Sequence, residues 1–134
     1  MSEIQYGLVR DLGAVDFQKA REATEASMKS EGFGTLTEID VKATMKKKID
    51  VEMNPYVILG ACNPQLAHQA LQAEPQIGLL LPCNIVLQQN DSGNIIVSAI
   101  DPVKMFEVVG RDDIKPIAEQ VRQKMANIIE GIKL

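Results

Sequence analysis

Two cysteines, each followed directly by an asparagine, are the residues of this chain best suited to chemistry. Cys62 and Cys83 are the only cysteines among 134 residues, and the only histidine, His68, lies between them. Thiolates and imidazole bind soft metal ions such as zinc and copper, and a thiolate is also a nucleophile. The stretch that holds them, residues 57–87, is rich in apolar residues, so the elements around it must decide between a site and a core.

The elements expected around Cys62 and Cys83 are two strands joined by a helix. The apolar run "YVILGAC" predicts a buried strand that ends at Cys62. Asn63 and Pro64 are favoured at a helix start, where free backbone amides would favour the thiolate of Cys62. The run "LLLPCNIVLQQ" predicts the next strand, and Pro82 indicates an edge position or a bulge. If these strands lie side by side, the two Cys-Asn pairs come together.

Three interpretations of these residues follow. Both cysteines could be small buried apolar residues, since free cysteine is among the most buried residue types. They could instead form a thiol or soft-metal site with His68, although no C-x-x-C chelate is present and His68 shares a polar helix face with glutamines. In the third interpretation, Asn63 and Asn84 bind a small polar or anionic ligand in a pocket, and Pro64 and Pro82 fix the conformation of the protein backbone around that pocket.

The rest of the chain predicts an α+β fold, a two-layer sandwich of a mainly antiparallel sheet with helices chiefly on one face. Strands are expected at 4–8, 35–40, 56–62, 79–89 and 95–100, and helices at 17–31, 41–49, 64–73, 102–109 and 114–132. The loop "NDSGN" predicts a hairpin between the last two strands. Both faces of strand 56–62 are apolar, so we expect a second subunit or the last helix to cover the far face, and we predict a homodimer.

Composition and charge indicate the cellular compartment of the protein and the kinds of partner it binds. A chain of 134 residues suits a single domain, residues 1–134, with a core that needs no disulfides. The net charge of −4 argues against nucleic acid as the main partner, and Lys42, Lys46, Lys47 and Lys48 are interpreted as the solvated face of a short helix. No apolar run approaches the roughly 20 residues that span a bilayer, and no signal peptide is recognised. We expect a cytoplasmic protein with reduced thiols, no membrane partner, no metal and no cofactor.

Two pieces of this sequence, "LGACNPQLAHQAL" and "EPQIGLLLPCNIVL", resemble in order and spacing the central motif of the family called domain of unknown function 302. The resemblance extends through "GFGTLTEIDVKATMKKK" and "SAIDPVKMF" and covers roughly residues 30–110. It implies a small α+β fold, a dimer and no established activity. It also implies that Cys62-Asn63-Pro64 and Pro82-Cys83-Asn84 are hallmarks of the family.

The leading functional hypothesis is a small-ligand-binding or sensing module, with its pocket at Cys62, Asn63, Cys83 and Asn84. One alternative is a thiol-dependent enzyme or a metal or redox protein that uses Cys62 and Cys83. Another is a structural or interaction homodimer without a ligand site. The sequence assigns no catalytic residue.

Overall fold

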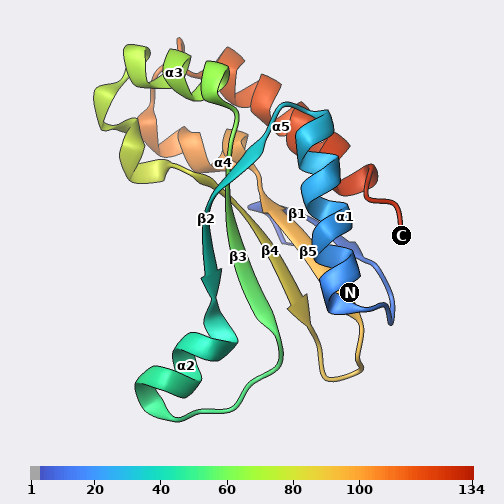
Figure 1. Ribbon diagram of the computed structural model, residues 1–134. Helices are drawn as coiled ribbons and strands as arrows, with labels where there is room; N and C mark the ends of the chain where they lie inside the picture. Colours follow the sequence, from blue (N-terminus) through green and yellow to red (C-terminus); the bar gives the residue numbers. More distant parts are fainter. Residues whose placement is uncertain (1–3) are drawn as a thin grey trace.

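The computed structural model of the protein describes residues 4–134, which form one five-stranded antiparallel sheet and its covering helices (Figure 1). The strand order β1-β5-β4-β3-β2 puts β4 at the centre. The α+β prediction is confirmed. In chain order the elements are β1 (Gly7–Asp11), α1 (Phe17–Ser30), β2 (Gly34–Asp40), α2 (Val41–Ile49), β3 (Tyr56–Cys62), α3 (Pro64–Ala73), η1 (Pro75–Leu80), β4 (Cys83–Gln89), β5 (Ile95–Ile100), α4 (Pro102–Phe106), η2 (Glu107–Val109) and α5 (Lys115–Glu130).

Polar side chains begin four of the α-helices, and three of these caps share one geometry. Asp16, Asp40 and Asn63 each accept a hydrogen bond from the backbone N–H three residues later, at 2.9, 2.9 and 3.2 Å. Such caps satisfy amides that have no partner inside the helix. Gly32, with φ of +78°, provides the left-handed backbone just after α1.

One face of the sheet is buried under helices. α1 lies across it, and α3, α4 and α5 gather at the end of the sheet where β3 and β5 end (Figure 1). α5 contributes a buried stripe of the predicted helical spacing, from Ile117 through Val121 and Met125 to Ile128. The side chains of this helix-covered face that come from the three central strands are Val57, Leu59, Ala61, Cys83, Ile85, Leu87, Ile95, Val97 and Ala99.

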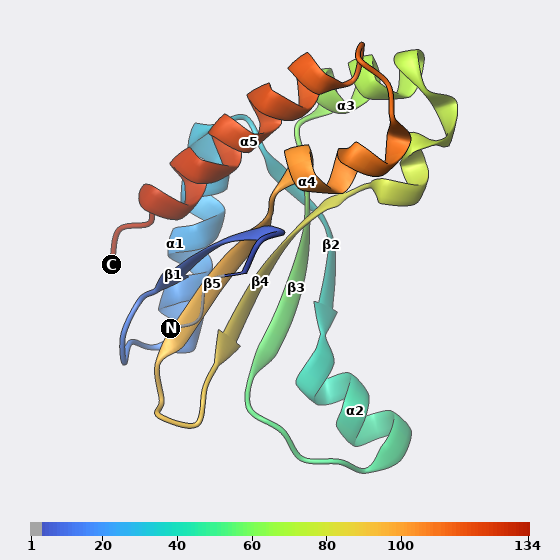
Figure 2. The ribbon, with the colours of Figure 1, turned by 180° about the vertical axis from the view of Figure 1, so that it is seen from behind.

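The opposite face has no helix over its middle among the described residues (Figure 2). We call it the bare face, and its central rows hold Val9, Ile39, Tyr56, Ile58, Val86, Gln88, Ile96 and Ser98. The expectation that the last helix might cover it is wrong. α5 ends on the helix-covered face, because its last carbonyls bind Arg10, which lies opposite the buried Val97.

β2 forms one edge of the sheet and leads into α2, which projects from the body of the molecule, and we call residues 34–50 the arm (Figure 1). Every residue of β2 is exposed, and α2 buries none of its side chains. Met45 and Ile49, which the helical pattern places on an apolar stripe, are 36% and 62% exposed. The arm therefore lacks the apolar packing that holds the other elements.

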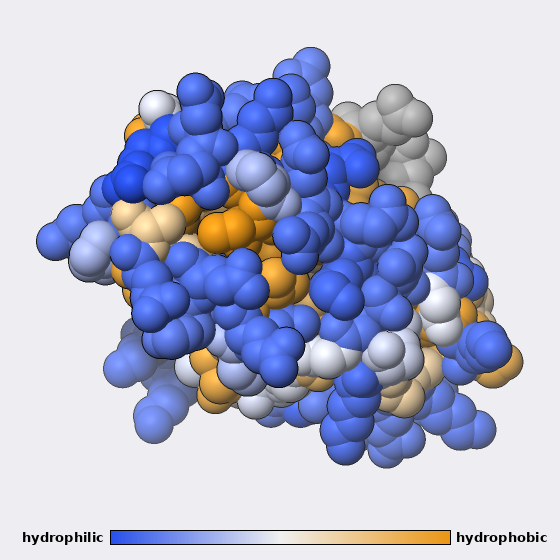
Figure 3. Space-filling view, turned by 90° about the horizontal axis from the view of Figure 1, so that it is seen from above, coloured by the Kyte–Doolittle hydropathy of each residue, from blue (hydrophilic) through white to orange (hydrophobic). Residues whose placement is uncertain are grey.

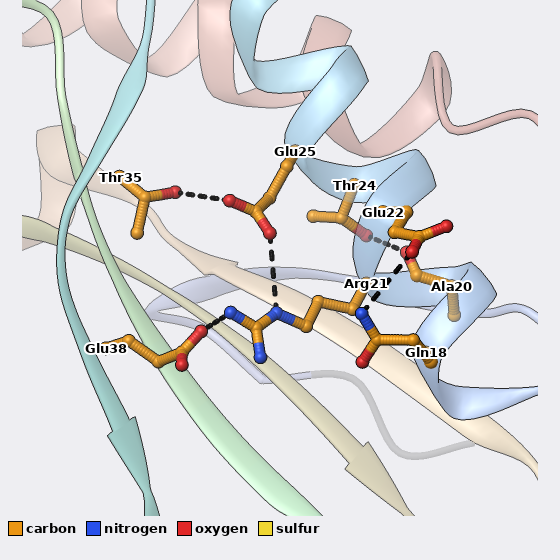
Figure 4. A network of polar contacts seen from close by, with 8 residues as sticks. All are labelled: Gln18, Ala20, Arg21, Glu22, Thr24, Glu25, Thr35 and Glu38. Carbon is orange, nitrogen blue, oxygen red and sulfur yellow. Dashed lines mark hydrogen bonds and ion pairs between the residues drawn. The ribbon is translucent and has the colours of Figure 1, made fainter.

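Polar contacts tie the arm to α1 (Figure 4). Arg21 of α1 forms ion pairs with Glu38 of β2 and with Glu25, the latter at 3.4 Å. Glu25 in turn accepts a hydrogen bond from Thr35 Oγ1 at 3.2 Å. All these groups are partly exposed, so they orient β2 but add little to stability.

Two predicted strands differ from the structure: the strand predicted at 4–8 is observed at Gly7–Asp11, and the strand predicted at 79–89 is shorter. It begins only at Cys83, because residues 75–80 form a 3₁₀ turn that leaves Leu79 84% exposed. Pro82 lies just before β4, so it removes no ladder donor, and β4 is the central strand with a regular register. The prediction of an edge position or a bulge at Pro82 is therefore wrong. The sheet's irregularity lies in β2, between Thr35 and Thr37.

Candidate functional site: an apolar cavity at the two cysteines

A cavity of about 300 Å³ lies at the end of the sheet, between α3 and α5. Figure 3 shows that end of the molecule from above, where apolar side chains lie in a hollow ringed by hydrophilic ones. The wall is almost wholly apolar, because α3 turns Leu66, Ala67 and Ala70 toward it. Its other lining residues are Phe33, Leu36, Ala61, Cys62, Asn63, Leu71, Gly78, Leu81, Pro82, Cys83, Phe106, Ile117 and Val121.

Both cysteines line this cavity as free thiols. They come together because β3 and β4 are neighbouring antiparallel strands, with Ala61 directly opposite Cys83. Cys62, the last residue of β3, is half-buried, while Cys83, the first residue of β4, is 5% exposed. The 20 residues that separate the two cysteines in the sequence form α3 and η1, which close the cavity from one side.

Burial makes these thiols weak acids. It raises the pKa of Cys62 above its ordinary value of 9.0. Burial, and then the neighbouring Cys62, raise the pKa of Cys83 to about 11. The expectation that the start of α3 favours the Cys62 thiolate is therefore wrong, since desolvation outweighs the helix N-terminus. At neutral pH both thiols line the cavity as neutral, soft groups.

The pKa of Cys83 predicts a loss of stability in alkali. The thiol titrates near 9.0 in the unfolded chain and near 11 in the native protein. Between these values the unfolded chain binds fewer protons than the native protein, so the free energy of unfolding falls as the pH rises. We expect no loss from this thiol below pH 9, and we expect its titration to lower the free energy of unfolding by about 2 kcal/mol by pH 11.

Urea unfolding at several pH values from 7.5 to 11, on the wild type and on Cys83→Ala, measures this contribution. Lysines and tyrosines titrate in both proteins, so the difference between the two slopes isolates the thiol. The variant should lose less stability than the wild type over this range. Equal slopes would contradict the burial of a protonated thiol at this position.

The asparagines that follow the cysteines have different surroundings. Asn63 lines the cavity, but its side chain accepts from the Leu66 amide at 3.2 Å and donates to the Glu31 carbonyl at 3.5 Å. Asn84 is exposed and follows the inward-facing Cys83 in β4, so it lies on the opposite face of the sheet, away from the cavity. Both ends of the Asn63 side chain already bind the backbone and Asn84 faces away, so the almost wholly apolar wall suits an apolar ligand better than the polar or anionic one expected from the sequence.

The two prolines also differ in position. Pro82 lines the cavity, whereas Pro64, at the first turn of α3, is exposed and does not. Pro82 lies close to Gly60 of β3, where an added Cβ would meet Pro82 Cγ at 2.7 Å and would overlap Thr37 Oγ1. This close approach of side chains explains the glycine that interrupts the apolar strand.

His68 lies outside the candidate site. It is exposed on the polar side of α3, as predicted. No cluster of three or more His, Cys, Asp or Glu residues able to hold a metal occurs within residues 4–134. Two carboxylates of the described residues, Glu74 and Asp101, serve the fold. Glu74 pairs with Arg111, and the buried Asp101 caps α4 and pairs with Arg122 at 3.0 Å.

Most residues of the cavity wall were not predicted from the sequence. Three of its residues come from distant segments and have the sequence pattern of ordinary core residues: Phe33, Phe106 and Val121. The available signal was the pair of small residues on the buried side of α3, Ala67 and Ala70, which leave space where larger side chains would fill a core.

Known proteins resemble this chain in sequence and in structure. The model of the family described as "Domain of unknown function DUF302" matches residues 10–132. A crystal structure of an "uncharacterized conserved protein DUF302" from Bacillus stearothermophilus is 26% identical to the chain, with a TM-score of 0.89, and the match covers 97% of this chain and 100% of that one. None of the curated proteins matches the chain. Within residues 4–134, no helix has the length and apolar character needed to cross a membrane.

Proposed function

The chain belongs to the family of domain of unknown function DUF302, and on that premise we propose that it is a small-ligand-binding module that holds an apolar molecule in the two-cysteine cavity. The observation that carries this proposal is an apolar cavity of about 300 Å³ that the protein's own side chains leave unfilled. Small-molecule sites are concave, mostly apolar and about 300–1,000 Å³ in volume. An apolar molecule that displaces water from this almost wholly apolar wall would gain free energy from burial.

The composition of the wall defines the ligand class. Cys62 and Cys83 are protonated at neutral pH, and the side chain of Asn63 is engaged in capping α3. A charged ligand would lose its hydration without gaining a partner, which is unfavourable. The ligand is therefore a neutral apolar molecule, or the apolar part of a larger one.

The thiol-dependent alternative finds less support. A nucleophilic cysteine needs a lowered pKa or an adjacent base. The pKa values of Cys62 and Cys83 are raised, and His68 lies on the solvent side of α3. The proposal accordingly assigns the thiols to the wall and not to a reaction.

We also propose a protein partner and a cellular compartment. A second copy of the chain is its partner, because an apolar sheet face without a helix over it suits a homodimer. The cytoplasm is the compartment that suits two free thiols close together in one cavity.

Titration with prodan, a neutral dye whose emission shifts to the blue in apolar surroundings, tests the proposed function. We expect saturable binding of one dye per chain, with a dissociation constant on the order of micromolar. Bound dye should also raise the melting temperature, because it binds the native state only. Linear, unsaturable fluorescence together with an unchanged melting temperature would sink the proposal.

A further inference from the structure

We infer that two copies of this chain pack bare face against bare face, with the α2 arms at the sides of the interface. This inference rests on the homodimer in the proposed function and names the surface that forms it.

The bare face is an apolar surface in the middle of the sheet. Its central row runs across all five strands, and Val86 of β4 lies between Ile58 of β3 and Ser98 of β5. Val9 and Ile39 complete the row at the two edges. None of these five residues is charged. Solvent-facing sheet surfaces normally carry polar residues in such a row, so this one is suited to contact with protein.

The next row of the bare face mixes apolar and polar residues. Tyr56 lies opposite Gln88, and Gln88 lies opposite Ile96. Asp11, at the edge of the sheet beside Ile96, is the one charged residue of this row. Because Gln88 lies on the central strand β4, the row through Val86 carries most of the apolar area of the bare face.

The arm supplies area that the sheet lacks. Five strands about 4.8 Å apart and roughly 20 Å long present roughly 500 Å² per partner, while a standard stable interface needs about 800 Å². Ile49 at the end of α2 and Val51, just after the arm, are 62% and 44% exposed and supply further apolar surface. A nine-residue helix is marginal in water on its own, so a partner that covers α2 would stabilise it.

A second copy suits this surface better than a different protein. An isologous contact requires a patch that complements itself, and an uncharged apolar sheet face does so without like-charge repulsion. The four lysines of α2 are accompanied within the arm by Glu38, Asp40 and Asp50, so the positive and negative charges of the arm nearly balance. The arm therefore adds no strong like-charge repulsion between two copies.

Light scattering coupled to size exclusion, on the full chain at micromolar concentration, tests the inference. The wild type should have twice the 14.7 kDa chain mass. Val86→Lys brings two lysines together at the centre of the proposed interface and should weaken the dimer at least 100-fold, which gives the monomer mass. Ile49→Lys in the arm should weaken it about 10-fold. Val108→Lys, at a position 79% exposed in η2, is the matched control and should leave the mass doubled.

Each outcome has a defined meaning. A wild type of monomer mass overturns the inference, and so does a Val86→Lys protein that stays dimeric. An unchanged dimer in Ile49→Lys overturns the role of the arm. If Val86→Lys loses its circular dichroism spectrum, Ile39→Lys at an exposed edge position decides in its place. Prodan titration of the same samples keeps the two proposals apart, because the cavity lies on the other side of the sheet.

Discussion

Ala70→Trp is expected to weaken prodan binding about 100-fold while the protein remains folded. Ala70 is 2% exposed and faces the cavity from the middle of α3. An indole at this position occupies the space of about 300 Å³ that the dye would enter. A 100-fold loss corresponds to about 2.7 kcal/mol of binding free energy. Overpacking a closed core costs about 1–3 kcal/mol, and the unfilled cavity should keep the actual loss of stability at the low end.

The matched control for this variant is Ala26→Trp. Ala26 is exposed on α1 and does not line the cavity, so the same substitution there should leave prodan affinity within about twofold. Fluorescence titration gives the affinity, and urea unfolding gives the stability of both variants. If both variants bind prodan as the wild type does, the dye binds elsewhere and the cavity is not its site.

Arg10→Ala is expected to lower the free energy of unfolding by about 2–3 kcal/mol. Arg10 Nη1 donates hydrogen bonds to the carbonyls of Ile129, Glu130 and Ile132, at 2.9, 3.2 and 3.1 Å. The last carbonyls of a helix have no donor within the helix and favour a positive charge. A hydrogen bond to a charged group contributes about 1.5–3 kcal/mol, and water can replace only part of this set because Ile129 and Ile132 are buried.

Two further variants separate this contact from surface electrostatics. Arg10→Lys keeps the positive charge and should recover about half of the loss. Arg21→Ala removes an arginine whose partners are partly exposed and should cost less than about 1 kcal/mol. Urea unfolding at neutral pH measures all three. An Arg10→Ala protein as stable as the wild type would mean that the end of α5 is held by its apolar packing alone.

Local patterns predicted the elements of the fold well. The three capping side chains Asp16, Asp40 and Asn63 begin helices where the sequence indicates, because a cap depends only on residues within one turn. The hairpin at "NDSGN" joins β4 to β5, since turn residues and alternation are also local. The segment before Pro82 was misjudged, because an apolar run of this length fits a strand or a 3₁₀ turn equally well.

The candidate site was predicted only in part. The sequence led to both cysteines, Asn63 and Pro82, which line one cavity. It also led to Asn84, which lies on the other face. The face of a strand residue is fixed by register, and a shift of one position reverses it. Cys83 and Asn84 are adjacent in β4, so their side chains point to opposite faces of the sheet and only one of them can line the cavity.

The sequence by itself determined which segments form strands and helices, where the helices begin, and that two thiols lie at the junction of strand and helix. These features depend on residues a few positions apart. Only the tertiary structure decided that the wall is apolar, that the thiols are protonated, and that one face of the sheet is bare. A cavity is the space left between segments from β2 to α5, and a pKa is set by the groups that exclude water from the thiol. Both depend on contacts between residues far apart in the chain, which no local pattern records.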